Sequence, residues 1–257
     1  MSSLKDRIVF ITGASSGIGE ACARAFGREG CALLLAARRK DRVDALAAEL
    51  SKAHGVRTLT LDLDVRSRNA VEAAIANLPD AWAAIDILIN NAGLSRGLSK
   101  LQEARVEDWE EMIDTNVKGL LYVSRAVVPG MVERKQGHVI NIGSIAAHQT
   151  YPGGNVYCAS KAAVRVITEG LKMDLLGTGV RVCGISPGMV ETEFSIVRYH
   201  GDEQRAAKTY ENMTPLTAGD VADVVLFAAT RPPHVDLPEI IMMPVDQASV
   251  YHVHRSS

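Results

Sequence analysis

Residues 8–19 read IVFITGASSGIG, and this stretch sets the expected fold of the 257-residue chain. The β-branched and aromatic run at its start predicts a buried strand, and the alanine-rich amphipathic stretch that continues to about residue 30 predicts a helix. The glycine turn between them would let a pyrophosphate approach the N-terminus of that helix. Its spacing is Gly-x-x-x-Gly-x-Gly, whereas the commoner dinucleotide fingerprint is Gly-x-Gly-x-x-Gly. Packing alone also favours glycine turns at helix starts, so the rest of the chain has to support a phosphate site.

Apolar runs alternate with amphipathic stretches along the whole chain, without a break in composition. Further strands are predicted at residues 32–37, 58–62, 85–89, 138–142, 180–185 and 239–243. The pattern predicts an α/β fold: a single domain over residues 1–257, with one doubly wound (Rossmann) parallel sheet of about seven strands and helices on both faces. Ligands of such sheets bind outside the carboxyl ends of the strands. The residues expected at that edge are Gly13, Arg38, Asp64, Asn91, Ser144 and Pro187.

The composition argues against several classes of function. A net charge of −2 gives no overall field for nucleic acid or an anionic membrane, and no run of 18 apolar residues predicts a membrane span. The first apolar run leads directly into the glycine turn, which favours a first strand over a signal peptide. Four cysteines without a Cys-x-x-Cys pair favour reduced thiols in a cytoplasmic protein. His252 and His254 alternate as two zinc ligands could, but no further ligand lies nearby, so no metal is expected.

The ends of the second and third predicted strands carry candidate residues for the adenosine half of a dinucleotide. Arg38 and Arg39 follow the second strand, where an acidic residue would hold the ribose hydroxyls and a basic residue suits a 2′-phosphate. They therefore favour NADP(H) over NAD(H), although they could also be the solvated start of a helix at residues 41–54. Asp64 could accept a hydrogen bond from the adenine amino group or cap the next helix.

Residues 144–161, SIAAHQTYPGGNVYCASK, carry the candidate chemistry. Tyr157 and Lys161 are four residues apart and would lie on one face of a helix, while Ser144 ends a predicted strand. An ammonium near a phenol lowers the pKa of the phenol, which makes it a usable proton donor or acceptor for carbonyl chemistry. The simpler interpretation is an amphipathic helix with a surface lysine. Cys158 is expected to pack rather than to react, because buried thiols are usually inert.

Two groups of polar side chains have either a structural or a functional interpretation. Residues 90–93 (Asn-Asn-Ala-Gly) could contact a cofactor or stabilise a turn. Asn116 lies within a long helical region predicted at residues 106–133, in which Pro129-Gly130 should interrupt the last third. Since asparagine is a poor residue inside a helix, Asn116 should either cap a local kink or serve a site.

Residues 189–216 lose clear periodicity and become polar, which favours a lid over the site rather than a linker. Arg198 in this segment is a candidate partner for an anionic substrate, because a guanidinium matches the geometry of a carboxylate. A surface arginine or an ion pair between subunits would explain it equally well. Arg255 in the C-terminal tail is a weaker candidate that could reach a neighbouring subunit.

Taken together and in order, TGASSGIG, NNAG, Ser144, Tyr157-x-x-x-Lys161 and Pro187-Gly188 resemble the short-chain dehydrogenase/reductase family over nearly the whole chain. Within the family, stretches such as INIGSIA, YPGGNVYCASKAAV and VETEFSIVR are similar to NADP-dependent 3-hydroxy acid dehydrogenases, which include enzymes of serine and allo-threonine, and to sulfoacetaldehyde reductases. Some members carry a basic residue inside the glycine turn. Here Ser15 and Ser16 stand there instead, which leaves 2′-phosphate recognition to the two arginines that follow the second strand.

The resemblance implies specific roles. Tyr157 would be the general acid/base, Lys161 would lower its pKa and hold the nicotinamide ribose, Ser144 would donate to the carbonyl oxygen, and Asn116 would hold a water of a proton relay. Substrate contacts would come from Ser144, Tyr157 and Arg198. The residues implied to line the cofactor are Gly13, Ser15, Ser16, Gly17, Ile18, Gly19, Arg38, Arg39, Asp64, Val65, Asn91, Ala92, Gly93, Tyr157, Lys161, Pro187, Gly188, Val190 and Thr192. The family also implies a homotetramer or a dimer.

The expected function is therefore hydride transfer between NADP(H) and a small 3-hydroxy acid (of the serine, allo-threonine or 3-hydroxypropionate type) or its oxo form. One alternative is a reductase of sulfoacetaldehyde or of an uncharged ketone or aldehyde. An alternative of another class is a sensor or scaffold that binds NADPH without catalysis, against which the complete Ser, Tyr, Lys and Asn set argues.

Overall fold

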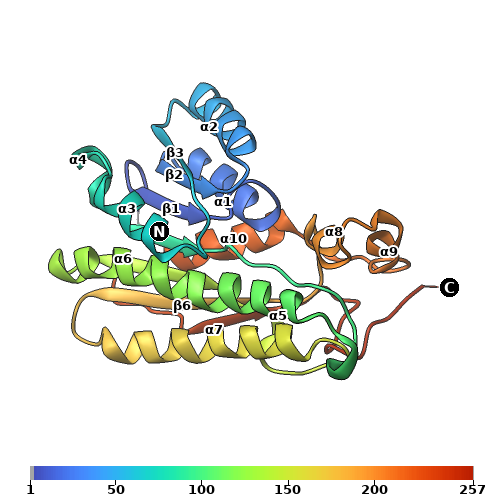
Figure 1. Ribbon diagram of the computed structural model, residues 1–257. Helices are drawn as coiled ribbons and strands as arrows, with labels where there is room; N and C mark the ends of the chain where they lie inside the picture. The colour runs from blue at the N-terminus through green and yellow to red at the C-terminus, as the bar shows by residue number, and fades with distance from the viewer. Residues whose placement is uncertain (1–2, 257) are drawn as a thin grey trace.

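The computed structural model describes residues 3–256, and seven parallel strands form its central sheet (Figure 1). The strand order is β3-β2-β1-β4-β5-β6-β9. The chain begins in the middle at β1, builds one side outward, then crosses to β4 and builds the other side, so the order reverses between β1 and β4. The strands are β1 (Ile8–Thr12), β2 (Ala32–Ala37), β3 (Thr58–Asp62), β4 (Ile87–Asn90), β5 (Gly137–Ile142), β6 (Val180–Pro187) and β9 (Glu239–Met242).

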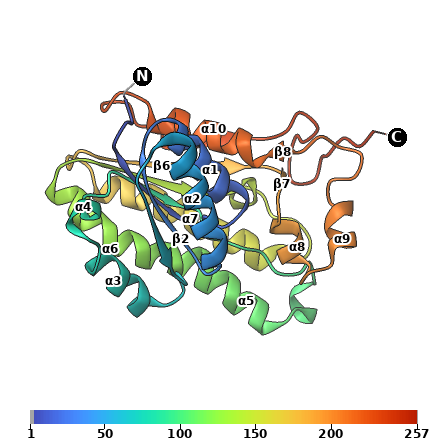
Figure 2. The ribbon, with the colours of Figure 1, turned by 90° about the horizontal axis from the view of Figure 1, so that it is seen from above.

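The helices form one layer on each face of the sheet (Figures 1 and 2). Alternate residues of β1 show why both faces are apolar: Val9 and Ile11 pack into one buried cluster, and Ile8 and Phe10 pack into the other. The first cluster is covered by α1 (Gly17–Arg28), α2 (Lys40–His54) and α10 (Ala218–Ala229). The second is covered by α3 (Arg68–Ala76), α4 (Asp80–Ala83), α6 (Leu120–Glu133) and α7 (Asn155–Asp174), and α5 (Val106–Ile113) packs on α7.

All seven predicted strands are present, and no strand end differs from its prediction by more than two residues. The agreement is close because each strand is a short β-branched or leucine-rich run bounded by polar residues or glycine. The fold class expected from the sequence is therefore confirmed.

The long helical region is interrupted at a different place from the one predicted. Pro129 lies inside α6, and the helix continues through it to Glu133, so the predicted interruption there is wrong. The irregular part is a π-helix, η2 (Asp114–Gly119), which separates α5 from α6 and contains Asn116. Gly119 at its end packs closely on the chain after β3, because a Cβ atom there would lie 2.6 Å from the Val65 side chain. The distortion thus lies where the helix approaches the carboxyl edge of the sheet.

The predicted cap of the third helix also differs. The Ser67 hydroxyl accepts a hydrogen bond from the Ala70 amide and caps α3. Asp64 does not cap the helix, because Arg66 Nη2 binds its carboxylate at 2.6 Å. An N-cap residue directly precedes the first residue of its helix, and in α3 this position is held by Ser67 rather than by Asp64.

Residues 189–216 contain short elements rather than an irregular loop. They comprise β7 (Val190–Glu191), α8 (Phe194–Arg198), α9 (Glu203–Lys208) and the start of β8 (Leu216–Thr217), and β7 pairs with β8 in a small parallel sheet. In both ribbon views α8 and α9 project from the main body (Figures 1 and 2). We refer to α8 and α9 as the lid.

The C-terminal tail runs along the lid. Arg255 donates hydrogen bonds to the backbone carbonyls of Thr209 and Glu211, directly after α9, and the Ser256 amide donates to the Asn212 carbonyl at 2.8 Å. Arg255 is therefore occupied within its own chain. None of the helices in residues 3–256 has the length and apolar character needed to cross a bilayer.

Candidate active site

A cavity of about 720 Å³ opens at the carboxyl edge of the sheet, beneath the lid. It brings together residues from nearly every strand end that the sequence singled out, as expected for the crevice where the strand order reverses. Ser144 and Arg198 line this cavity. The predicted cofactor residues that also line it are Gly13, Ser15, Ser16, Gly17, Ile18, Arg38, Arg39, Asp64, Val65, Asn91, Ala92, Gly93, Tyr157, Lys161, Pro187, Gly188, Val190 and Thr192. Gly19 and Asn116 are not among the residues that line the cavity, and the contact of Gly19 with the cofactor stays a prediction.

The glycine turn between β1 and α1 forms a cradle with no room for side chains. Gly13 has a φ of +66°, and a Cβ atom on Gly19 would lie 2.3 Å from the Gly13 carbonyl oxygen. The side-chain Nδ2 of Asn91 donates to the carbonyls of Thr12 and Gly13 at 3.0 and 3.1 Å, so the polar segment after β4 holds the turn in place. The bare backbone at the start of a twelve-residue helix fits a pyrophosphate group.

Ser144, Tyr157 and Lys161 lie together on the wall of this cavity. Ser144 follows β5, and the other two lie one turn apart near the start of α7, with exposed fractions of 8%, 8% and 6%. Lys161 Nζ donates to the Ile142 carbonyl at the end of β5 at 2.9 Å, which ties the helix to the strand. The position of the phenol is also set by Phe194 of the lid, whose ring centroid lies 5.7 Å from that of Tyr157.

The electrostatics of the phenol differ from the sequence expectation. Burial raises the pKa of Tyr157, whereas the positive charge of Arg198 and the nearby Ser144 hydroxyl lower it. Burial lowers the pKa of the Lys161 ammonium to about 8, so this group is only partly charged in weakly alkaline solution. Arg198 is therefore a second cation beside the phenol, in addition to the lysine that the sequence pattern suggested.

Asn116 has a well-defined structural task. Its Oδ1 accepts from the Leu94 amide at 2.8 Å, and its Nδ2 donates to the Leu94 carbonyl at 2.8 Å and to Ser160 Oγ at 3.0 Å. Both N–H groups are therefore used. Asn116 fastens the loop after β4 to α7 next to Tyr157, which explains why an asparagine stands in the π-helix. Its role in holding a water stays a prediction.

Arg198 extends from the lid over the catalytic candidates. Its guanidinium carbon lies 5.3 Å from the centroid of the Tyr157 ring and 4.9 Å from that of Phe194, and its Nη2 donates to the Tyr151 hydroxyl at 3.2 Å. Its Nε is buried without a hydrogen-bond partner. Within residues 3–256 no carboxylate lies at ion-pair distance from Arg198, so this cation has no internal counter-ion.

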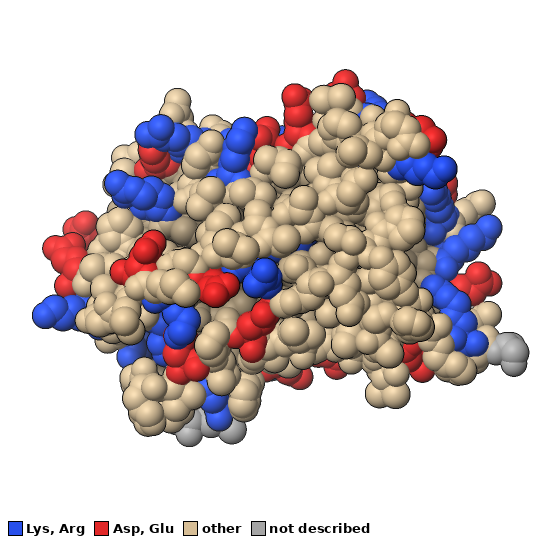
Figure 3. Space-filling view, turned by 90° about the horizontal axis from the view of Figure 1, so that it is seen from below, with Lys and Arg blue, Asp and Glu red and all other residues tan. Residues whose placement is uncertain are grey.

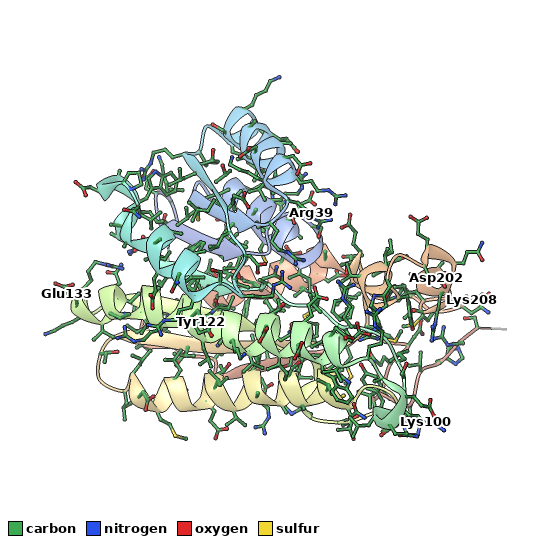
Figure 4. All side chains as sticks on the ribbon, in the orientation of Figure 1. Arg39, Lys100, Tyr122, Glu133, Asp202 and Lys208 are labelled. Carbon is green, nitrogen blue, oxygen red and sulfur yellow. The ribbon has the colours of Figure 1, made fainter. Side chains whose placement is uncertain are left out.

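The two arginines after β2 lie at the other end of the cavity. Arg39 donates from Nε to Ser15 Oγ at 3.2 Å and from Nη2 to Ser16 Oγ at 2.6 Å, so it is bound to the glycine turn itself. Figure 4 shows Arg39 on the side of the sheet that faces the lid. Arg38 instead points toward Glu111, with 3.9 Å between Nη1 and Oε1. The predicted basic end of the site is thus present at the phosphate cradle.

Comparison with known proteins supports this geometry. A family model described as short chain dehydrogenase matches residues 7–202. This chain belongs to the short-chain dehydrogenase family. An NADP-dependent 3-hydroxy acid dehydrogenase of Salmonella typhi is 52% identical over 251 residues, which cover 97% of this chain and 100% of the relative. A sulfoacetaldehyde reductase of Chromohalobacter salexigens is 46% identical and covers 96% of this chain and 98% of the relative.

A solved structure gives the same result at the level of the fold. The closed form of a serine dehydrogenase complexed with NADP⁺ is 49% identical and superposes with a TM-score of 0.91, covering 97% of this chain and 100% of that one. The family and the doubly wound sheet expected from the sequence are therefore confirmed.

Several residues that shape the site of this short-chain dehydrogenase were not foreseen. Arg96 binds Glu111 at 2.7 Å and donates to the Val197 carbonyl at 2.6 Å, which anchors the C-terminal end of α8 to the loop after β4. Tyr151 orients Arg198. Glu193, at the start of α8, binds both Arg39 and Arg42. No local pattern signals such residues, because each has a partner 47 or more residues away, although Arg96 also binds Glu111 at a separation of 15 residues.

Proposed function

We propose that this chain is an NADP(H)-dependent dehydrogenase that interconverts a small 3-hydroxy acid and its 3-oxo acid or semialdehyde. The observation that carries this proposal is the half-buried Arg198 guanidinium beside Tyr157, because a cation that has no counter-ion among the described residues fits an anionic substrate. The comparisons bear out the predicted cofactor and reaction class, since the relative from Salmonella typhi is an NADP-dependent 3-hydroxy acid dehydrogenase.

The residues of the chain would divide the work as follows. The glycine turn receives the pyrophosphate, and Arg39 with the Ser15 and Ser16 hydroxyls receives the 2′-phosphate. Bound NADP(H) supplies or accepts the hydride at its nicotinamide ring. Lys161 Nζ lies 3.5 Å from the point where a Cβ atom on Gly93 would stand. From this position beside Tyr157, the ammonium would hold the nicotinamide ribose.

Proton transfer falls to the Tyr157 hydroxyl. During oxidation the phenolate takes the proton of the substrate hydroxyl, while the hydride leaves the carbon that bears this hydroxyl. During reduction both steps run in reverse. Ser144 donates to the reacting oxygen, and Asn116 keeps the loop after β4 fastened behind the site. Arg198 holds the carboxylate end of the substrate, which fixes the distance from the carboxylate to the reacting carbon.

Charge-matched substrates test this proposal. Initial rates with NADP⁺ should be compared for serine, allo-threonine, 3-hydroxypropionate, 3-hydroxyisobutyrate and isethionate, and for the methyl ester of 3-hydroxypropionate, which lacks the charge. Removing a charge-assisted contact costs about 1.5–3 kcal/mol, so Arg198→Gln should raise KM for the acid by roughly 10- to 150-fold and leave that of the ester nearly unchanged. The matched control is Arg205→Gln, because Arg205 is a lid arginine that does not itself line the cavity and stacks on the outer part of the lid through Tyr199. Equal KM values for the acid in wild type and Arg198→Gln would remove the anion role.

A sulfonate is the second candidate, because the guanidinium of Arg198 also suits three equivalent oxygens and a relative is a sulfoacetaldehyde reductase. A preference for isethionate over 3-hydroxypropionate would assign this activity. Activity on apolar ketones and none on acids would indicate an uncharged substrate. NADPH binding without turnover over the whole panel would indicate a sensor or scaffold.

A homotetramer, or a dimer, is proposed for the assembly. Exposed apolar side chains support it: Leu121 on α6, Val166 and Met173 on α7, and Leu176 just after α7. The face on the side of α7 carries a wide area without charged side chains (Figure 3). Light scattering coupled to gel filtration would test the assembly. We also propose a cytoplasmic location, which is supported by four free and buried cysteines.

A further inference from the structure

Glu193 connects the lid to the arginines of the proposed 2′-phosphate site. It directly precedes α8, and its two carboxylate oxygens bind two different guanidinium groups: Oε2 lies 2.8 Å from Arg39 Nη1, and Oε1 lies 2.7 Å from Arg42 Nη1. Both arginines lie at the start of α2, more than 150 residues earlier in the chain. The carboxylate therefore bridges two cations from another part of the fold, and both arginines lower the pKa of Glu193.

The Arg39 guanidinium shows what this carboxylate replaces. Two of its nitrogen atoms donate to Ser15 and Ser16, and the third donates to Glu193. A carboxylate and a phosphate bind a guanidinium through the same arrangement of N–H groups. Glu193 thus occupies the anion position of the very guanidinium that the proposed function assigns to the 2′-phosphate. Arg42 supplies a second cation at that position, and the sequence pattern did not indicate a role for this residue.

We infer that Glu193 is a specificity-determining residue, an internal anion that the 2′-phosphate of NADP(H) has to displace. The inference rests on the proposed function, because it takes NADP(H) as the cofactor. NAD(H) carries no group that competes for Arg39 and Arg42, so it leaves the Glu193 bridge intact. The 2′-phosphate of NADP(H) breaks the bridge and binds the two guanidinium groups in its place. The free energy of these new contacts is reduced by that of the Glu193 contacts that are lost.

Displacement has a consequence for the substrate side of the cavity. Glu193 immediately precedes Phe194 and lies five residues before Arg198, so it anchors the start of the helix that carries both. The other end of α8 stays attached through the Arg198 carbonyl, which accepts from the Gly97 amide at 2.8 Å. Binding of the 2′-phosphate would therefore remove the Glu193 contacts at the start of α8, where Ser195 stays bound to the Tyr210 hydroxyl at 2.8 Å, and would leave the other end of the helix attached.

Equilibrium binding tests the inference without turnover. NADPH, NADH and adenosine 2′,5′-bisphosphate are titrated into wild type and Glu193→Gln, which keeps the shape and removes the charge. Each of the two ion pairs is about 40% exposed and therefore individually weak, so the dissociation constants of NADPH and the bisphosphate should fall by about three- to tenfold. NADH should change less than twofold, and the gain should shrink at 1 M salt.

Two comparisons separate displacement from a general charge effect. Glu191→Gln removes an exposed carboxylate two residues away that has no ion pair among the described residues, and it should leave NADPH binding unchanged. In an Arg42→Gln background, Glu193→Gln should tighten NADPH binding less than in wild type, because one of its partners is already gone. Equal tightening of NADH and NADPH, an equal effect of Glu191→Gln, or unchanged or weaker NADPH binding in Glu193→Gln would each overturn the inference. If wild type bound NADH at least as tightly as NADPH, the proposed cofactor itself would be wrong.

Discussion

Replacing Arg198 should change the acidity of Tyr157 as well as the binding of the substrate. The guanidinium carbon lies 5.3 Å from the centroid of the phenol ring, and its charge lowers the pKa of a group that burial raises. Lys161 gives weaker support in the absence of cofactor, since burial brings its own pKa to about 8 and its Nζ is bound to the Ile142 carbonyl. Arg198→Gln should therefore raise the pKa of Tyr157, and Arg198→Lys should largely preserve it.

The size of the effect follows from the distance. If two unit charges were separated by the 5.3 Å between the guanidinium carbon and the ring centroid, they would interact by roughly 3 kcal/mol at an effective dielectric constant near 20. Arg198 is half-buried and partly screened by water, so the interaction that Arg198→Gln removes should be weaker than this value. The sign is fixed: a cation favours the phenolate, so its removal makes deprotonation harder.

The assay is the pH dependence of kcat/KM for alcohol oxidation, which rises with pH as the general base loses its proton. An uncharged substrate such as the methyl ester of 3-hydroxypropionate keeps the anion-binding role of Arg198 out of the measurement. The apparent pKa should move up in Arg198→Gln and stay close to its wild-type value in Arg198→Lys and in the control Arg205→Gln. An unchanged or lowered pKa in Arg198→Gln would refute the reasoning.

Two further predictions concern α7. Tyr157→Phe should lower kcat by at least about a hundredfold, because general acid/base catalysis contributes 10²–10⁴-fold, while NADPH titration should give a dissociation constant within about twofold of wild type; retained turnover would remove Tyr157 from proton transfer. Lys161→Met should reveal the free energy that folding loses by burying the ammonium. The pKa of Lys161 falls from 10.5 in the unfolded chain to about 8 in the folded protein, so the unfolded chain binds more protons between these two pH values. In denaturant unfolding, the stability of wild type relative to Lys161→Met should rise by about 3 kcal/mol from pH 8 to 10.5, and a flat difference would contradict the assigned burial.

The sheet and the positions of most site residues could be predicted from local patterns. A parallel strand is buried on both faces, so each one appears as a short apolar run, and its carboxyl end marks the site edge without knowledge of the packing. The glycine turn and the Tyr157–Lys161 spacing each lie within a few consecutive residues, so they can also be recognised without knowledge of the packing. Pro129 misled the prediction because proline is rare inside helices, yet α6 continues through it.

Other features depend on tertiary packing and leave no trace in the pattern. The segment that forms the lid is polar and without a period, so the short helix that places Arg198 over Tyr157 could not be inferred. Asn116 was singled out because it is unusual in a helix, but its partner Leu94 lies 22 residues away. The Glu193 bridge spans more than 150 residues. Such contacts are set by how the lid folds back on the sheet edge.

The contact between the C-terminal tail and the lid has a practical consequence for handling the protein. Arg255 and Ser256 bind the backbone just after α9, so a purification tag joined behind them would begin next to the end of the lid. The first described residues lie on the far side of the sheet from the lid (Figure 2). An affinity handle is therefore better attached at the amino end, and kinetic constants measured with a carboxyl-terminal fusion should be repeated after its removal.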